Sequence, residues 1–131
     1  MADDSDMRVL AFLPPAMQDA MGRLEVAIRG TLSRCESATE FVTGFAAGNY
    51  SVVILPGSTL SAREWWTVWG VLSLLEQRPS ILVCALTSDV QMWAGVLASG
   101  CYDVVVPPFT SNNLRAAVEA AHTEFMARTE P

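Results

Sequence analysis

The side chains most able to do chemistry in this sequence are three cysteines and one histidine. Cys35, Cys84 and Cys101 form no C-x-x-C pair, and His122 lies far along the chain from them. A metal site needs ligands at close spacing, so this pattern argues against one. No serine or cysteine lies in register with His122 as a nucleophile, and no G-x-S-x-G motif is present. We therefore expect no enzyme activity, no cofactor and no bound metal, Mg²⁺ included.

The charge balance argues against nucleic acid and membrane surfaces as partners. The chain has 8 Lys+Arg residues, 14 Asp+Glu residues and a formal net charge of −6. Every basic residue is an arginine, and no two of them are adjacent. Phosphate groups are bound by clustered cations, which this distribution does not supply. The absence of lysine also excludes any mechanism that needs a Schiff base.

Length and hydropathy indicate a single domain over residues 1–131. The hydrophobic fraction of 51% is enough for a substantial core. The longest uncharged window, Phe41–Ala62, is interrupted by glycines and a proline, so no stretch reaches the roughly 20 apolar residues of a membrane span. Met1–Asp6 carries three aspartates, the wrong sign for a signal peptide. We expect a cytoplasmic protein with a disordered acidic tail over residues 1–6.

A strand–helix–strand unit over Ile81–Phe109 forms the centre of the predicted fold. It begins with the apolar run Ile81–Leu86, which suits a strand buried on both faces. Apolar residues then recur at helical spacing until Gly100, and the β-branched segment Val104–Val106 follows. The apolar residues of this helix are Val90, Trp93, Ala94 and Leu97. Two parallel strands joined by a helix make one βαβ unit.

The rest of the chain repeats the same alternation of strand and helix. Three further strands are predicted over Arg8–Leu13, Thr31–Cys35 and Tyr50–Leu55, the second being weak and typical of a sheet edge. Capping boxes that begin at Ser37 and Ser61 open the second and third helices, and the third is expected to reach about Gln77. The first helix has its apolar face over Met17–Ile28, and the last runs from about Ser111 to Arg128. Five β–α units with short loops predict a parallel sheet with helices on both faces.

The segment Ala98–Leu114 resembles part of the receiver domains of bacterial response regulators. Receivers have there a helix that ends in Gly, an Asp, a hydrophobic strand, a Lys-Pro-Phe sequence, a capping residue and a Leu. The matching residues here are Gly100, Asp103, Val104–Val106, Pro108-Phe109, Thr110 and Leu114. The resemblance extends from Arg8 to about Arg128. It implies a flavodoxin-like (CheY-like), doubly wound α/β fold with strand order 2-1-3-4-5 and a cis bond at Pro107–Pro108.

The positions that carry receiver chemistry are, with one exception, occupied by other residue types. In the family, an acidic pair after the first strand helps to hold Mg²⁺, an Asp ending the third strand accepts a phosphoryl group, and a Thr or Ser ends the fourth strand. An aromatic switch residue lies in the fifth strand, and a Lys precedes the proline after it. The corresponding residues here are Leu13 and Pro14, Leu55 (or Pro56 with a register slip of one), Thr87, Val104, and Pro107 before Pro108. Only Thr87 matches, and we expect it to cap the next helix.

Physical chemistry agrees with that comparison. Mg²⁺ needs oxygen ligands, and phosphoryl transfer needs concentrated positive charge around the transferred group. Hydrocarbon at these positions supplies neither. The resemblance and its departures together imply a degenerate receiver, or pseudo-receiver, which keeps the fold without the phosphorelay chemistry.

Tryptophans supply the candidate interaction surface. Trp65 and Trp93 fall on inward positions of their helices and Trp69 falls at the margin, and all three are expected in the core. Trp66 falls on the outer side of its helix, and Leu74 also projects away from the predicted core. Tryptophan is enriched at binding hot spots, so self-association or partner binding is predicted here. Proteins of the receiver family pair more often through the fourth and fifth helices, where Met92 would lie, and that alternative stays open.

Two hypotheses for the function follow from the sequence. The first is a non-phosphorylatable, receiver-like signalling module that acts by protein–protein contact, either with a partner or with a second copy. The second is a sensor of small apolar ligands in the cleft at the carboxyl ends of the strands, a common ligand position in such folds. The rim of that cleft would be Leu13, Pro14, Leu55, Pro56 and Pro107. A rim closed by its own side chains would count against the sensor.

Overall fold

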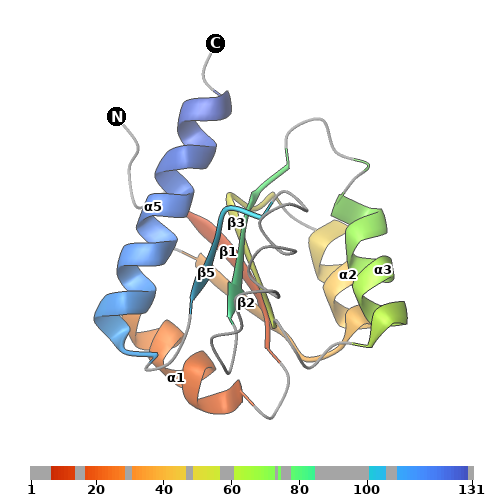
Figure 1. Ribbon diagram of the computed structural model, residues 1–131, viewed down its shortest axis with the longest axis horizontal. Helices are drawn as coiled ribbons and strands as arrows, with labels where there is room; N and C mark the ends of the chain where they lie inside the picture. The colour runs from red at the N-terminus through yellow and green to blue at the C-terminus, as the bar shows by residue number, and fades with distance from the viewer. Residues whose placement is uncertain are drawn as a thin grey trace.

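A five-stranded parallel sheet in the order β2-β1-β3-β4-β5 forms the centre of the molecule (Figure 1). Its strands are β1 (Arg8–Phe12), β2 (Thr31–Cys35), β3 (Val52–Pro56), β4 (Ser80–Cys84) and β5 (Asp103–Val105). The chain order reverses between β1 and β3, as in the doubly wound flavodoxin-like fold that the sequence predicts. The predicted fold class and strand order are therefore confirmed.

In the described part of the chain, four helices cover the two faces of this sheet: α1 (Gln18–Ala27), α2 (Ala38–Ala46), α3 (Ala62–Leu72) and α5 (Ser111–Thr129). Helices α1 and α5 lie on one face, and α2 and α3 lie on the other (Figure 1). The computed structural model describes residues 7–13, 17–28, 31–46, 49–56, 61–72, 74, 78–84, 101–105 and 109–129. The helix expected between β4 and β5, with Met92 and Trp93, lies outside these residues. Among the described helices, none is both long and apolar enough to cross a membrane.

Strands β3 and β4 are the most completely buried elements of the sheet. All five residues of each strand are buried. Successive side chains of a strand point to opposite faces, so Val52 and Ile54 enter the core under α1 and α5, whereas Val53 and Leu55 enter the core under α2 and α3. Helices on both faces explain why these strands read as continuous apolar runs rather than as alternating ones.

The predicted capping boxes position α2 and α3. The Ser61 hydroxyl accepts a hydrogen bond from the Glu64 amide at 3.2 Å, and the Glu64 carboxylate accepts one from the Ser61 amide at 3.1 Å. At α2, the Ser37 hydroxyl accepts from the Glu40 amide at 3.1 Å. These bonds satisfy amides that have no partner inside the helix. Both helices therefore start where the sequence places them.

Several predicted bounds are wrong. By one residue, β1 ends at Phe12 rather than Leu13, and β4 and β5 begin at Ser80 and Asp103 rather than at Ile81 and Val104. Strand β3 runs over Val52–Pro56 rather than Tyr50–Leu55. Tyr50 instead packs against the end of α2, with its hydroxyl donating to the Gly44 carbonyl at 3.3 Å. Helix α3 does not continue to Gln77, since Leu74 lies in a turn whose amide donates to the Val71 carbonyl at 3.4 Å. Leu74 is 85% exposed, as its predicted position outside the core requires.

A buried polar link joins α5 to the amino end of the sheet. Ser51, just before β3, donates its amide to the Arg8 carbonyl at 2.9 Å. Its hydroxyl oxygen lies 2.8 Å from Nδ1 of His122, and both side chains are buried. Buried polar groups cost free energy unless they are hydrogen-bonded. The pair therefore fixes the position of α5 over β3.

Replacing Ser51 with alanine should lower the free energy of unfolding by about 1–3 kcal/mol, because Nδ1 of His122 would stay buried without this partner. Chemical denaturation measures the change. Ser33→Ala on the half-buried edge strand β2 is the matched control, and we expect its effect to stay within about 0.5 kcal/mol. An S51A variant as stable as the wild type would show that the link is not stabilising.

Candidate functional site

The candidate site lies at the carboxyl edge of the sheet, where the strand ends meet because the strands are parallel. Leu13 directly follows β1, and β3 ends at Pro56, which is in register with Cys84 at the end of β4. One position earlier, Leu55 is in register with Val83. The described ends of the three central strands thus carry only apolar side chains or a thiol.

Leu13 and Leu55, at two receiver positions, are both completely buried, with 0% exposure. Leu13 packs in the core under α1 and α5, and Leu55 packs in the core under α2 and α3. The two side chains therefore enter different cores and do not converge on a common site. At these two positions the edge is closed by its own side chains.

Val104, at the position of the receiver switch residue, is also buried. It is in register with Val83 and packs in the core under α2 and α3. The valine fills this core as an aliphatic side chain rather than as an aromatic ring. The remaining receiver positions, Pro14, Thr87, Pro107 and Pro108, lie outside the described residues.

Two of the carboxylates at this edge lie beside the outer strand β2. Glu36 and Glu40 follow β2, and they line a small pocket of about 220 Å³ with Arg34. The Glu40 carboxylate accepts a hydrogen bond from the Glu36 amide at 2.8 Å, so it is used to cap α2. Arg34 pairs with Glu25 of α1. In the described part of the chain, no group of three or more His, Cys, Asp or Glu residues could hold a metal ion.

The cysteine thiols are buried and protonated at neutral pH. Burial raises the pKa of Cys84 to about 12. Burial, and secondarily the negative charge of Glu40, raises the pKa of Cys35 to about 12. The thiolate rather than the thiol is the nucleophile and metal ligand, so these two residues serve as small core side chains.

His122 does have a serine partner, which corrects the expectation from the sequence. Ser51 is 71 residues away along the chain and reaches His122 only through the packing of α5 over β3. Both side chains are at most 4% exposed, so a substrate has no access to the hydroxyl oxygen. The geometry gives this pair a structural role.

Comparisons with known proteins identify the fold. No protein-family model matches the chain, and no curated protein matches it. Among solved structures, a CheY-like response regulator receiver domain protein from Methanospirillum hungatei matches with a TM-score of 0.75 and 10% identity, over 93% of this chain and 98% of that one. A two-component response regulator from Clostridium difficile matches with a TM-score of 0.72 and 19% identity, over 96% of this chain and 100% of that one. A protein described as pilus assembly-related from Burkholderia pseudomallei gives 0.72 and 19%, over 95% of both chains. The chain therefore has the receiver-domain fold.

Introducing the receiver acid as Leu55→Asp should destabilise the protein by about 3–5 kcal/mol at neutral pH, because it buries a carboxylate among apolar side chains. The cost should shrink as the pH falls toward about 4, since burial raises the pKa of the new carboxyl and the neutral form is tolerated better. Denaturation at two pH values measures both effects. Leu74→Asp, the same change at an exposed leucine, should alter stability by less than about 0.5 kcal/mol. Equal effects of the two variants would contradict the burial of Leu55.

Proposed function

We propose that this chain is a receiver-like signalling module that is not phosphorylated and that acts through contact with other proteins. The receiver fold supports the signalling role. The observation that carries the proposal is the full burial of Leu13 and Leu55, at positions where receivers have acids. Leucine offers neither an oxygen for Mg²⁺ nor a nucleophile for a phosphoryl group.

The alternative function, a sensor of small apolar ligands at the carboxyl edge, has less support. It requires accessible hydrocarbon at the rim, whereas Leu13 and Leu55 are enclosed by the two cores. Ligand pockets are concave and largely formed before the ligand binds. Burial at both positions therefore favours the protein-contact module.

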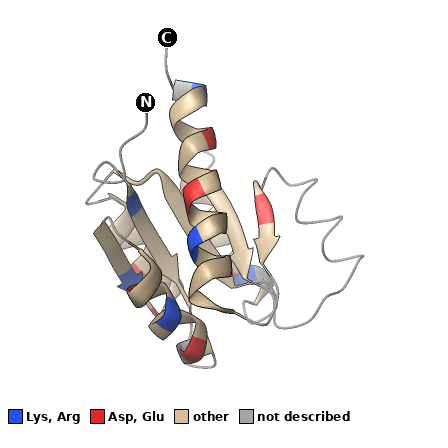
Figure 2. Cartoon of the chain, turned by 90° about the vertical axis from the view of Figure 1, so that its left-hand side faces the viewer, with Lys and Arg blue, Asp and Glu red and all other residues tan. Residues whose placement is uncertain are grey.

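The distribution of charge supports a protein as the partner. Figure 2 shows acidic and basic residues interspersed over the described helices and strands rather than gathered by sign. Nucleic acids and anionic membranes are bound by clustered positive charge. The net charge of −6 would instead repel such anionic partners. We propose a second copy of the chain or another protein as the partner, with no Mg²⁺ or other cofactor.

Incubation with acetyl phosphate and Mg²⁺ should leave the intact mass and the amide NMR spectrum unchanged, because the phosphoacceptor position holds leucine. A receiver domain that has all of the family's acidic residues should gain one phosphoryl group under the same conditions and serves as the control. An acyl phosphate on any aspartate of this chain would contradict the proposal.

The outer side of α3 is the proposed contact surface. Trp66 is 74% exposed. Its neighbour Trp65 is half-buried against the core, where its ring packs edge-on against that of Trp69 with the ring centroids 5.8 Å apart. Leu74, just beyond the helix, is also exposed. Trp66 lies within α3 and Leu74 lies just beyond its last residue, so both exposed apolar side chains belong to this helix and its end. An exposed tryptophan, with its large rigid ring, is typical of a binding hot spot.

Trp66→Glu should convert a self-associated wild type to monomers, as measured by light scattering, because it places a charge at the centre of the contact. Val26→Glu is a close control, since Val26 is 73% exposed on α1, on the opposite face of the sheet. We expect V26E to associate like the wild type. A dimer that survives W66E would place the interface elsewhere, and a monomeric wild type would contradict self-association.

A further inference from the structure

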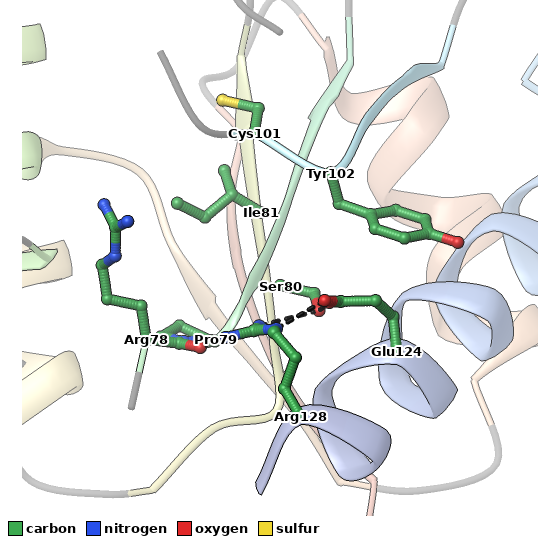
Figure 3. A pocket seen from close by; sticks show the side chains of 8 residues that line it. All are labelled: Arg78, Pro79, Ser80, Ile81, Cys101, Tyr102, Glu124 and Arg128. Atoms are coloured by element: carbon green, nitrogen blue, oxygen red, sulfur yellow. Dashed lines mark hydrogen bonds and ion pairs between the residues drawn. The ribbon is translucent and has the colours of Figure 1, made fainter. Parts of the chain in front are cut away.

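A pocket of about 430 Å³ opens at the amino edge of β4 and β5, opposite to the candidate receiver site (Figure 3). Its walls come from the segment that leads into β4, the segment that leads into β5, and the last turns of α5. The volume lies in the range of small-molecule sites. Its lining includes three charged side chains, Arg78, Glu124 and Arg128, which determine what it could bind.

One wall of the pocket is an electrically neutral network. Arg128 forms an ion pair with Glu124, and its Nη2 donates to the Arg78 carbonyl at 3.0 Å and to the Ser80 hydroxyl oxygen at 3.4 Å. The Ser80 hydroxyl in turn donates to the Glu124 carboxylate. Burial raises the pKa of Glu124, but the hydrogen bonds from Arg128 and Ser80 and the Arg128 charge lower it by more. Glu124 is therefore ionised and already matched by Arg128.

The side chain of Arg78 lies on the opposite side of the pocket from Glu124 (Figure 3). It is half-buried, and it forms no ion pair with any residue in the described part of the chain. Burial raises the pKa of Cys101 to about 11, by more than the charge of Arg78 acts to lower it. Because the thiol stays neutral, it does not compensate the guanidinium. Among the described side chains that line the pocket, two arginines accompany one carboxylate, which leaves one positive charge in excess.

Apolar groups complete the lining. Tyr102 is 39% exposed and presents its ring beside Glu124 (Figure 3), while Pro79 and Ile81 lie buried at the base. An aromatic wall and a separate cation can hold the two ends of one amphipathic molecule. The arrangement differs from the sealed carboxyl edge, where the described side chains fill the space themselves.

We infer that this pocket binds a small organic anion, whose carboxylate or phosphate pairs with Arg78 and whose apolar body lies against Tyr102. Arginine binds both anions through two parallel hydrogen bonds, and partial burial strengthens the pairing. The inference does not depend on the absence of phosphorylation, because the two sites lie at opposite edges of the sheet.

Titration of the ¹⁵N-labelled protein with phenyl phosphate and with benzoate tests this. Both should shift the amides of Ile81, Tyr102 and Arg128 saturably, with dissociation constants on the order of 1 mM or tighter. Benzyl alcohol, which keeps the ring without the charge, should bind at least about tenfold more weakly. No saturable shift with either anion, or equal binding of the alcohol, would overturn the inference.

Variants separate the charge from the ring. Arg78→Gln should weaken the binding of both anions by about tenfold or more. Arg63→Gln, which removes an exposed arginine from α3, should leave both affinities unchanged. Tyr102→Ala should weaken phenyl phosphate but not inorganic phosphate. Equal losses in R78Q and R63Q would show that only net charge matters and would overturn the assignment to this pocket. If the wild type binds inorganic phosphate and phenyl phosphate equally well, the inference that the ligand has an apolar organic part is overturned.

Discussion

The burial of β3 and β4 between two helical layers is the constraint on which the rest of the structure depends. Each fully buried aliphatic side chain of these strands contributes roughly 1.5–3 kcal/mol, and Val52–Leu55 distribute that contribution between the two cores. From Val52 in β3 and from Ile81 in β4, the strands must then be apolar up to their carboxyl ends. In a receiver that end carries an acid, which interrupts the hydrocarbon. Here Leu55 continues it, so the core extends to the edge where a phosphoryl group would be bound.

Polar chemistry is correspondingly concentrated at the other edge of the sheet. Ser51 and Ser80, which precede or begin the two central strands, face His122 and Glu124 of α5. A backbone hydrogen bond also connects the two serines, since the Ser80 amide donates to the Ser51 carbonyl at 2.9 Å. In the described residues, the amino edge therefore combines hydrogen-bonded polar groups with an open pocket, whereas the carboxyl edge near Leu13 and Leu55 is apolar and filled.

Local patterns predicted the elements, and contacts between distant segments decided what the sequence could not show. Apolar runs predicted β3 and β4, and the capping boxes located the starts of α2 and α3, because each signal lies within a few neighbouring residues. The same spacing correctly placed Leu74 outside the core but extended the third helix too far, since Leu74 lies in a turn beyond α3. The Ser51–His122 pair could not be predicted, because only the packing of α5 brings together residues that are 71 positions apart. The receiver positions Leu13 and Leu55 were found by resemblance, and their full burial is a tertiary property.

The direction of the helices explains why a site at the amino edge would need arginine. In a parallel α/β fold the helices run opposite to the strands, so helix amino ends, with their partial positive charge and free amides, lie at the carboxyl edge. The amino edge receives helix carboxyl ends, whose partial charge repels anions. Arg128, in the last turn of α5, compensates that end and pairs with Glu124. Because Glu124 neutralises Arg128, a further cation is needed to attract an anion from solution. Arg78 is that cation in this pocket.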